Sequence, residues 1–242
     1  MDRSHGTGGK AAPPRLSLWA QEPLAVPKLL VGGFRRPAPV ERKGAGRPVM
    51  VIPGMLSGDG STRLLRRTLT SAGYDAQGWG EGFNNTISPD RLSRAERRLT
   101  DLADRGGKLP IIVGWSLGGF YARALAQRHP ELVSMVVTLG TPFSGDRHAN
   151  NAWRLYEFLN DHPVDAPPIA EDPSQKPAVH TIAVWSRKDG IVAPECARGL
   201  DHERDEDIEL PFRHFEMGSS KRGTAMIAQI LNDRRHIAEA ND

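Results

Sequence analysis

A serine bracketed by glycines, in Gly114-Trp115-Ser116-Leu117-Gly118, is the part of this sequence best suited to carry chemistry. An apolar run at 111–113 leads directly into it, and a helical pattern over 117–128 follows without a connecting loop. A strand that becomes a helix in one step needs a strained turn, and glycines at 114 and 118 leave room for it. We therefore expect Ser116 to act as a nucleophile at the edge of a sheet. The alternative is an ordinary strand-to-helix loop in which the serine only caps the helix.

The elements that must position this serine follow a regular order from Pro48 onward. Short apolar runs alternate with longer amphipathic runs, which is typical of βα units and a mostly parallel sheet. Strands are predicted at 49–52, 75–79, 111–113, 133–139, 179–185 and 208–210. Helices are predicted at 62–72, 89–103 and 117–128, with a closing helix over 224–231. The fold class is therefore α/β.

Three segments divide the chain in this interpretation. Residues 1–46 are rich in Pro and Gly and are predicted to be a tail followed by a packing segment on the outside of the domain. Residues 47–236 form the α/β domain, and residues 237–242 form a C-terminal tail. The packing segment is suggested by two groups of apolar residues, which are Leu16, Leu18, Trp19 and Leu24, Val26, Leu29, Leu30, Val31.

Composition and charge exclude several other classes of protein. Aromatic residues make up only 6% of the 242 residues, and the net charge is +3, so nucleic acid is not an expected partner. The only cysteine excludes an internal disulfide, and no Cys/His cluster has zinc spacing, so we expect no metal or other cofactor. No stretch has the roughly 20 apolar residues of a membrane span, and no secretory signal is apparent. A cytoplasmic protein with no stable membrane insertion is expected.

With the serine turn in this setting, the chain resembles the α/β-hydrolase family over about residues 48–231. The resemblance implies the α/β-hydrolase fold, with a mostly parallel central sheet flanked by helices, and a catalytic order of Ser, then Asp or Glu, then His. The loop Ser186-Arg187-Lys188-Asp189-Gly190 is similar to the family's acid loop, so Asp189 is the matching acid. The segment after the last strand is similar to the histidine loop of lipase- and esterase-like members, and His214 is the matching base.

Other histidines and acids compete for these roles. His148 and His162 lie in the segment after residue 145, and His202 lies in a charged segment before the last strand, so each remains an alternative base. Asp146 is the leading alternative acid because it also follows a strand. Asp189 is preferred because its loop matches the family better.

The remaining site predictions concern the oxyanion and the substrate. Backbone N–H groups of Leu117 and, by resemblance, Met55 are expected to form the oxyanion hole. In the family a cap is inserted after the strand that the family counts as its sixth, which corresponds here to the strand at 133–139, and we expect a short helical cap at about 145–178. The predicted substrate-binding residues are Trp115, Phe83, Phe143, Trp153 and Tyr156. For the aromatic residues of the cap, shielding of substrate and simple packing on the core are equally open.

The resemblance implies a serine hydrolase of the esterase or lipase type, with a catalytic triad. It would cleave a small-molecule carboxylic ester that has an apolar acyl or alkyl group, through an acyl-enzyme intermediate. A thioesterase or an acyltransferase would use the same triad, and a non-catalytic binding protein could be built on the same scaffold. The sequence does not give the oligomeric state or the physiological substrate.

Overall fold

A six-stranded parallel sheet forms the centre of the molecule in this computed structural model, which describes residues 11–25 and 36–242. The strands are β1 (Pro48–Ile52), β2 (Asp75–Gly78), β3 (Ile111–Trp115), β4 (Met135–Leu139), β5 (His180–Trp185) and β6 (Glu206–Glu209). They lie in the order β2-β1-β3-β4-β5-β6, and each neighbouring pair is parallel. The predicted α/β fold with a central parallel sheet and flanking helices is confirmed.

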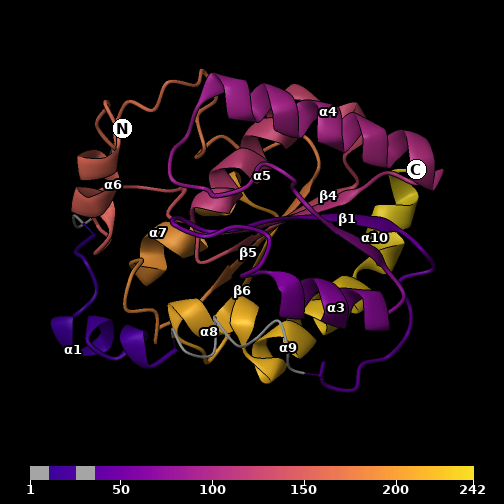
Figure 1. Ribbon diagram of the computed structural model, residues 1–242, viewed down its shortest axis with the longest axis horizontal. Coiled ribbons are helices and arrows are strands. Elements are labelled where there is room, and N and C mark those ends of the chain that lie inside the picture. Colours follow the sequence, from indigo (N-terminus) through magenta and orange to yellow (C-terminus); the bar gives the residue numbers. More distant parts are fainter. Residues whose placement is uncertain (1–10, 26–35) are drawn as a thin grey trace, which may run out of the picture.

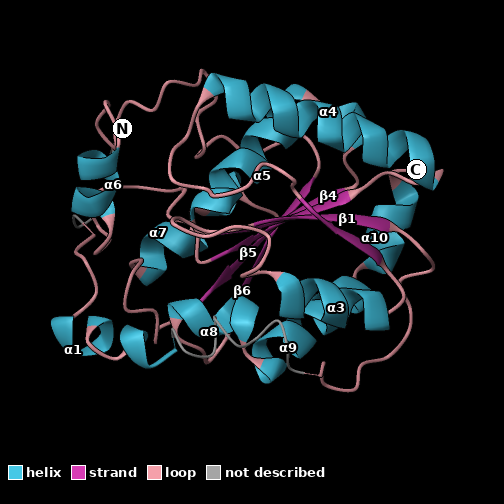
Figure 2. Ribbon diagram, in the orientation of Figure 1, coloured by secondary structure: helices cyan, strands magenta, loops and turns pink. Residues whose placement is uncertain are grey.

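Helices cover both faces of the sheet (Figures 1 and 2). One face is covered by α4 (Pro89–Gly106) and α5 (Leu117–Arg128). The other face is covered by α3 (Arg63–Ser71), α8 (His214–Ser219) and α9 (Lys221–Asp233). Short helices lie at the periphery, namely α1 (Leu16–Trp19), α6 (Trp153–Leu159), α7 (Pro194–Arg198), α10 (Arg235–Ala240) and the 3-10 turns at 22–25, 130–132 and 201–203.

Alternation along the strands explains why both faces are covered. In β1, the side chains of Val49 and Val51 join the core under α3 and α9, whereas Met50 and Ile52 join the core under α4 and α5. Successive strand residues point to opposite faces, so an uninterrupted apolar run requires helices on both sides. For this reason, each of the strands β1, β3 and β4 has all five of its residues buried.

The predicted C-terminal tail at 237–242 is ordered. Most of it belongs to α10, where Ala238 is fully buried. The guanidinium of the buried Arg47 donates hydrogen bonds of 2.8 and 2.6 Å to the Asp242 carboxylate. The Asn241 side chain donates to the Ser134 carbonyl oxygen. These contacts join the last residues to the positions immediately before β1 and β4, a feature that the local hydrophobic pattern does not reveal.

The predicted N-terminal packing segment is described only in part. Val26, Leu29, Leu30 and Val31 lie outside the described residues. In the described part, Leu16, Trp19 and Leu24 are exposed, whereas Leu18 is partly buried. The buried side chain of this segment is instead that of Glu22.

Candidate functional site

Ser116 occupies a strained turn between β3 and α5. Its φ and ψ are 52° and −120°, in a region that residues with a Cβ atom rarely adopt. The turn is held from both sides, because the Ser116 N–H donates to the Leu139 carbonyl oxygen and the Thr141 hydroxyl donates to the Ser116 carbonyl oxygen. The predicted strand-to-helix junction is present, with the serine side chain at the carboxyl edge of the sheet.

Glycines allow this turn to approach its neighbours closely. A Cβ at Gly118 would lie 2.4 Å from the Ile52 carbonyl oxygen, and a Cβ at Gly114 would lie 2.5 Å from the Gly118 carbonyl oxygen. Gly54 lies against Ser116, since a Cβ there would be 3.2 Å from that of the serine. The sequence analysis predicted that Gly114 and Gly118 leave room for the turn, and the structure shows that Gly54 also does so.

Asp189 and His214 come together from the ends of β5 and β6. Nδ1 of His214 lies 2.7 Å from Oδ2 of Asp189, and both side chains are buried. The other oxygen of Asp189 accepts hydrogen bonds of 2.8 Å from the N–H groups of Ile191 and Val192. The backbone of its own loop therefore holds one oxygen of the carboxylate, while the other oxygen contacts the His214 ring.

The charge of Asp189 controls the titration of His214. Burial lowers the pKa of the imidazole, but the Asp189 carboxylate opposes this through its charge and its hydrogen bond. Glu22 acts in the same direction, and the resulting pKa of His214 lies above the ordinary value of 6.5. A carboxylate on Nδ1 also leaves Nε2 as the nitrogen able to take up a proton.

His214 and Ser116 line the same cavity, which has a volume of about 460 Å³. The described residues show no hydrogen bond between the serine hydroxyl and the ring, whereas the bond from the ring to Asp189 is formed. Catalytic hydrogen bonds are often long in unliganded enzymes and tighten when substrate binds. The structure thus brings Ser116, Asp189 and His214 to one edge of the sheet.

The competing histidines have other neighbours. The ring of His148 lies 3.3 Å from Asp146 and packs edge-on against Trp153. His162 lies 3.4 Å from the Tyr156 hydroxyl. His202 is exposed. None of the three lines a described cavity together with Ser116.

The two backbone groups predicted for the oxyanion hole flank the serine. Met55 and Leu117 both line a narrow cavity with Ser116, and among the described residues neither amide has a hydrogen-bond acceptor. The loop that carries Met55 is held by Asn84, whose buried side chain donates to the Pro53 carbonyl oxygen at 2.8 Å. The Asn84 carbonyl oxygen in turn accepts from the Leu56 N–H.

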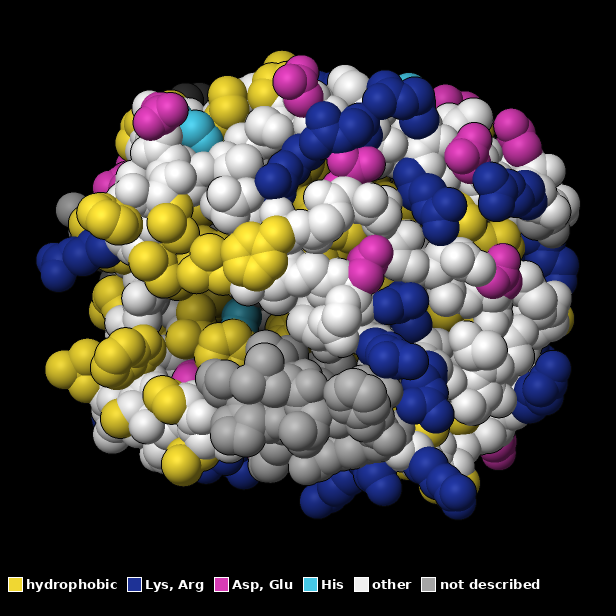
Figure 3. Space-filling view, in the orientation of Figure 1, with side chains coloured by type: hydrophobic (Ala, Val, Ile, Leu, Met, Phe, Trp, Pro, Cys, Tyr) yellow, Lys and Arg dark blue, Asp and Glu magenta, His cyan; other side chains and the backbone are white. Residues whose placement is uncertain are grey.

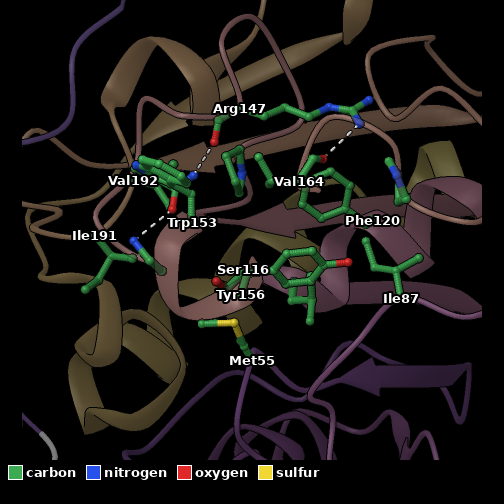
Figure 4. Close-up of a pocket in the computed structure, with 15 residues that line it drawn as sticks. Met55, Ile87, Ser116, Phe120, Arg147, Trp153, Tyr156, Val164, Ile191 and Val192 are labelled. Carbon is green, nitrogen blue, oxygen red and sulfur yellow. Dashed lines mark hydrogen bonds between the residues drawn. The ribbon is translucent and has the colours of Figure 1, made fainter. Parts of the chain in front are cut away.

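The narrow cavity, of about 50 Å³, runs from Ser116 beneath α6. Figure 4 shows Ser116 between Met55 and Trp153 at one side of this cavity. Its lining is mostly apolar and includes Ile87, Phe120 and Val164. Arg147 stabilises the segment that carries Val164, because its guanidinium donates hydrogen bonds to the carbonyl oxygens of residues 164 and 165.

The five predicted substrate-binding residues are divided by the structure. Trp153 and Tyr156 line the narrow cavity, and Trp115 lines the large one. Phe143 lies away from both cavities, buried beneath the Arg123 guanidinium at 4.2 Å from its ring centre. Phe83 is exposed and lines neither cavity. An aromatic residue in a loop near the sheet edge can pack in the core, lie in solvent or line a pocket. The residue type alone does not tell which of these three environments it occupies.

The large cavity opens between segments that are distant in sequence. Trp19 and Pro23 from the N-terminal segment, Leu155 from α6 and Phe215 from α8 contribute to its wall. Hydrophobic side chains gather around a hollow on this face of the molecule (Figure 3). No helix among the described residues is long and apolar enough to cross a membrane. The same residues contain no group of three or more His, Cys, Asp or Glu side chains suited to a metal ion.

Comparison with known proteins supports the same fold. Residues 97–166 match a family described as alpha/beta hydrolase fold, a stretch that contains Ser116 but neither Asp189 nor His214. The carboxylesterase EstE1 from a metagenomic library is similar in structure, with a TM-score of 0.61 and 12% identity over 92% of this chain and 98% of that one. No curated protein sequence matches the chain.

Two further solved structures have the same architecture. A Pyrobaculum calidifontis esterase gives a TM-score of 0.61 at 10% identity, covering 90% of this chain and 92% of that one. A Paleococcus ferrophilus monoacylglycerol lipase gives a TM-score of 0.55 at 15% identity, covering 80% and 96%. At such identities the likeness establishes the fold, while activity has to be argued from the site.

Proposed function

Because the chain has the α/β-hydrolase fold, we propose that it is a serine hydrolase that cleaves carboxylic esters through an acyl-enzyme intermediate. The observation that carries the proposal is the buried Asp189–His214 pair, 2.7 Å apart, opening into the cavity that Ser116 also lines. Esterases and lipases among the structural neighbours agree with this reaction class.

The reaction begins with attack of the Ser116 hydroxyl on the ester carbonyl carbon. Nε2 of His214 takes the hydroxyl proton as the new C–O bond forms, and Asp189 stabilises the resulting imidazolium. The carbonyl oxygen becomes an oxyanion, which accepts hydrogen bonds from the amides of Met55 and Leu117, neither of which has another acceptor among the described residues. His214 then returns the proton to the alcohol oxygen as the ester bond breaks. Water next attacks the acyl-enzyme by the same steps, which releases the acid and restores the Ser116 hydroxyl.

The two cavities suggest which part of the ester each one holds. The leaving alcohol must receive its proton from His214, so it belongs in the large cavity, which His214 lines. The acyl chain then belongs in the narrow cavity, which Ser116 and Leu117 line without His214. A volume of about 50 Å³ has room for roughly four water molecules, or a similar number of carbon atoms. We therefore propose esters with a short acyl chain and a larger apolar alcohol.

Hydrolysis of p-nitrophenyl acetate by purified variants tests this function. Ser116→Ala and His214→Ala are expected to lose turnover while remaining folded. Ser71→Ala is a matched control, because that hydroxyl is exposed and donates to the Arg67 carbonyl oxygen within α3. Undiminished turnover by folded Ser116→Ala would refute the proposal, and turnover retained by His214→Ala would move the base to His148, His162 or His202.

A further inference from the structure

Among the described residues, Glu22 is the most deeply buried carboxylate outside the Asp189–His214 pair. It belongs to a short 3-10 turn, Glu22–Ala25, in the N-terminal segment, yet it is only 1% exposed. Its Oε1 accepts hydrogen bonds from the N–H groups of Gly190 at 2.8 Å and His214 at 2.9 Å. Its Oε2 accepts a third, of 3.2 Å, from Phe215. One side chain thus joins the loop of the acid to the backbone of the base.

The backbone around Glu22 is docked at the same place. A Cβ at Gly190 would lie 2.6 Å from the carbonyl oxygen of Leu18, so this glycine lets α1 lie directly on the acid loop. The Arg213 side chain donates to the Gln21 side-chain oxygen at 2.9 Å. The Asn151 side chain donates to the carbonyl oxygens of both Pro14 and Gly190. Residues 14–22 are thereby fixed to both loops of the candidate site.

We propose that Glu22 is a positioning residue for the reaction, holding His214 and the Asp189 loop in the alignment that proton transfer from Ser116 requires. The proposal rests on the proposed serine hydrolase function. It assigns to the N-terminal segment a part in the active site, where Trp19 and Pro23 also contribute to the wall of the large cavity.

The chemistry of the contact favours a carboxylate at this position. The N–H groups of Gly190, His214 and Phe215 would lack these acceptors if the side chain were apolar, and buried unpaired donors are costly. An ionised carboxylate has enough lone pairs for all three donors, and charge-assisted bonds are the stronger kind. An amide at residue 22 retains one acceptor oxygen and replaces the other with an NH₂ group, which would face the donating N–H of Phe215.

The charge of Glu22 also reaches the imidazole. Among the described residues, the charged groups that act on His214 are Asp189 from the loop after β5 and Glu22 from the N-terminal segment, and Arg213 and Glu216 lie beside His214 in sequence. Arg213 and Glu216 lie 3.6 Å apart and form an ion pair. Because Glu22 helps to raise the pKa of His214, replacement by a neutral residue should lower that pKa.

Kinetics of Glu22→Gln test the proposal against two controls on the full-length protein. Glu131→Gln removes an exposed carboxylate far from the site, and Leu24→Ala alters an exposed side chain of the same 3-10 turn. We expect Glu22→Gln to lower kcat for a p-nitrophenyl ester by on the order of 10- to 100-fold with little change in KM, because misalignment of reacting groups affects the chemical step. The controls should keep wild-type kcat.

A second readout does not depend on turnover. Titration of the His214 ring by NMR in the Ser116→Ala background should show a lower pKa when Glu22→Gln is added. A wild-type kcat together with a wild-type His214 titration in folded Glu22→Gln would overturn the role of Glu22. Inactivity of the wild-type protein toward every ester would instead count against the proposed function, while the His214 titration would still report on Glu22.

Glu22→Asp keeps the experiment decisive if Glu22→Gln does not fold. The shorter side chain retains the charge but withdraws the carboxylate from the three amide donors. We expect a reduced kcat with a pKa of His214 that stays near the wild-type value. A wild-type kcat for folded Glu22→Asp would show that the reach of the carboxylate does not matter and would contradict the proposal.

Discussion

Oδ2 of Asp189 lies 2.7 Å from Nδ1 of His214, with 1% and 3% of the two side chains exposed. This buried pair has a measurable consequence for pH dependence. The base must be neutral to accept a proton, and the pKa of His214 is raised above 6.5 by the Asp189 and Glu22 carboxylates, which together outweigh the effect of burial. Activity should therefore be lost as the pH falls through a value above 6.5.

The pH dependence of kcat/KM, measured with a non-ionising ester, checks this sign. Its acid limb reports the pKa of the essential base in the free enzyme. A midpoint above 6.5 is expected for the wild-type protein. A midpoint well below 6.5 would mean that burial dominates, or that another group is the base.

Gly140 lies against the same pair and gives a second prediction. A Cβ at this position would lie 3.0 Å from both Asp189 Oδ2 and His214 Nδ1, and the residue has a φ of 56°. Gly140→Ala should lose about 1 kcal/mol or more of folding free energy from the positive φ. It should also lose kcat, because the methyl group displaces the carboxylate or the ring.

Gly107→Ala separates these two effects. Gly107 has nearly the same φ, 57°, but a Cβ there would have no neighbour within 4 Å. Urea denaturation should show that both variants are destabilised, whereas ester kinetics should show that only Gly140→Ala is impaired. Equal activity of the two variants would mean that the Asp189–His214 geometry tolerates the displacement.

The size of the narrow cavity predicts the preference for acyl length. In a series of p-nitrophenyl esters, kcat/KM should be highest for short acyl chains and should fall as the chain outgrows about 50 Å³. In a second series of acetate esters, larger apolar alcohols should be accepted, because the cavity lined by His214 is about 460 Å³. The opposite pattern would reverse the assignment of the two cavities.

Trp153→Ala tests the wall of the narrow cavity directly. Loss of the indole should enlarge the cavity and shift the preferred acyl chain to greater length. Phe158→Ala is the matched control, since that side chain belongs to the same helix, α6, and is 85% exposed. An unchanged chain-length profile for Trp153→Ala would remove α6 from the acyl site.

The sequence predicted the central elements because their apolar runs are long and regular. The strand before Ser116 and the helix after it lie where expected, as α5 spans Leu117–Arg128. The predicted pairing of Asp189 with His214 depended on chain order and loop resemblance, and the structure places the two in contact. Local pattern was sufficient wherever burial of a helix face or a strand determined the structure.

Contacts between distant segments could not be predicted in this way. Glu22 lies in a Pro-containing segment without periodicity, and its partners are about 170 to 190 positions away, at Gly190 and His214. The apolar neighbours Leu16 and Trp19 suggested packing of the segment, but both are exposed, and a carboxylate provides the anchor. Likewise, nothing in the last residues indicates that Asp242 pairs with Arg47. Such contacts depend on which buried N–H groups still need a hydrogen-bond acceptor once the fold has assembled.

Covalent labelling of Ser116 is the most direct test of the central claim. A fluorophosphonate should react with the wild-type protein at one site, which mass spectrometry of the digested protein identifies as Ser116. Folded Ser116→Ala should remain unlabelled, and Ser71→Ala should be labelled at the wild-type rate. Labelling of Ser116 is the result that a serine hydrolase predicts. Folded wild-type protein that stays unlabelled, or that is labelled at a different residue, would contradict it.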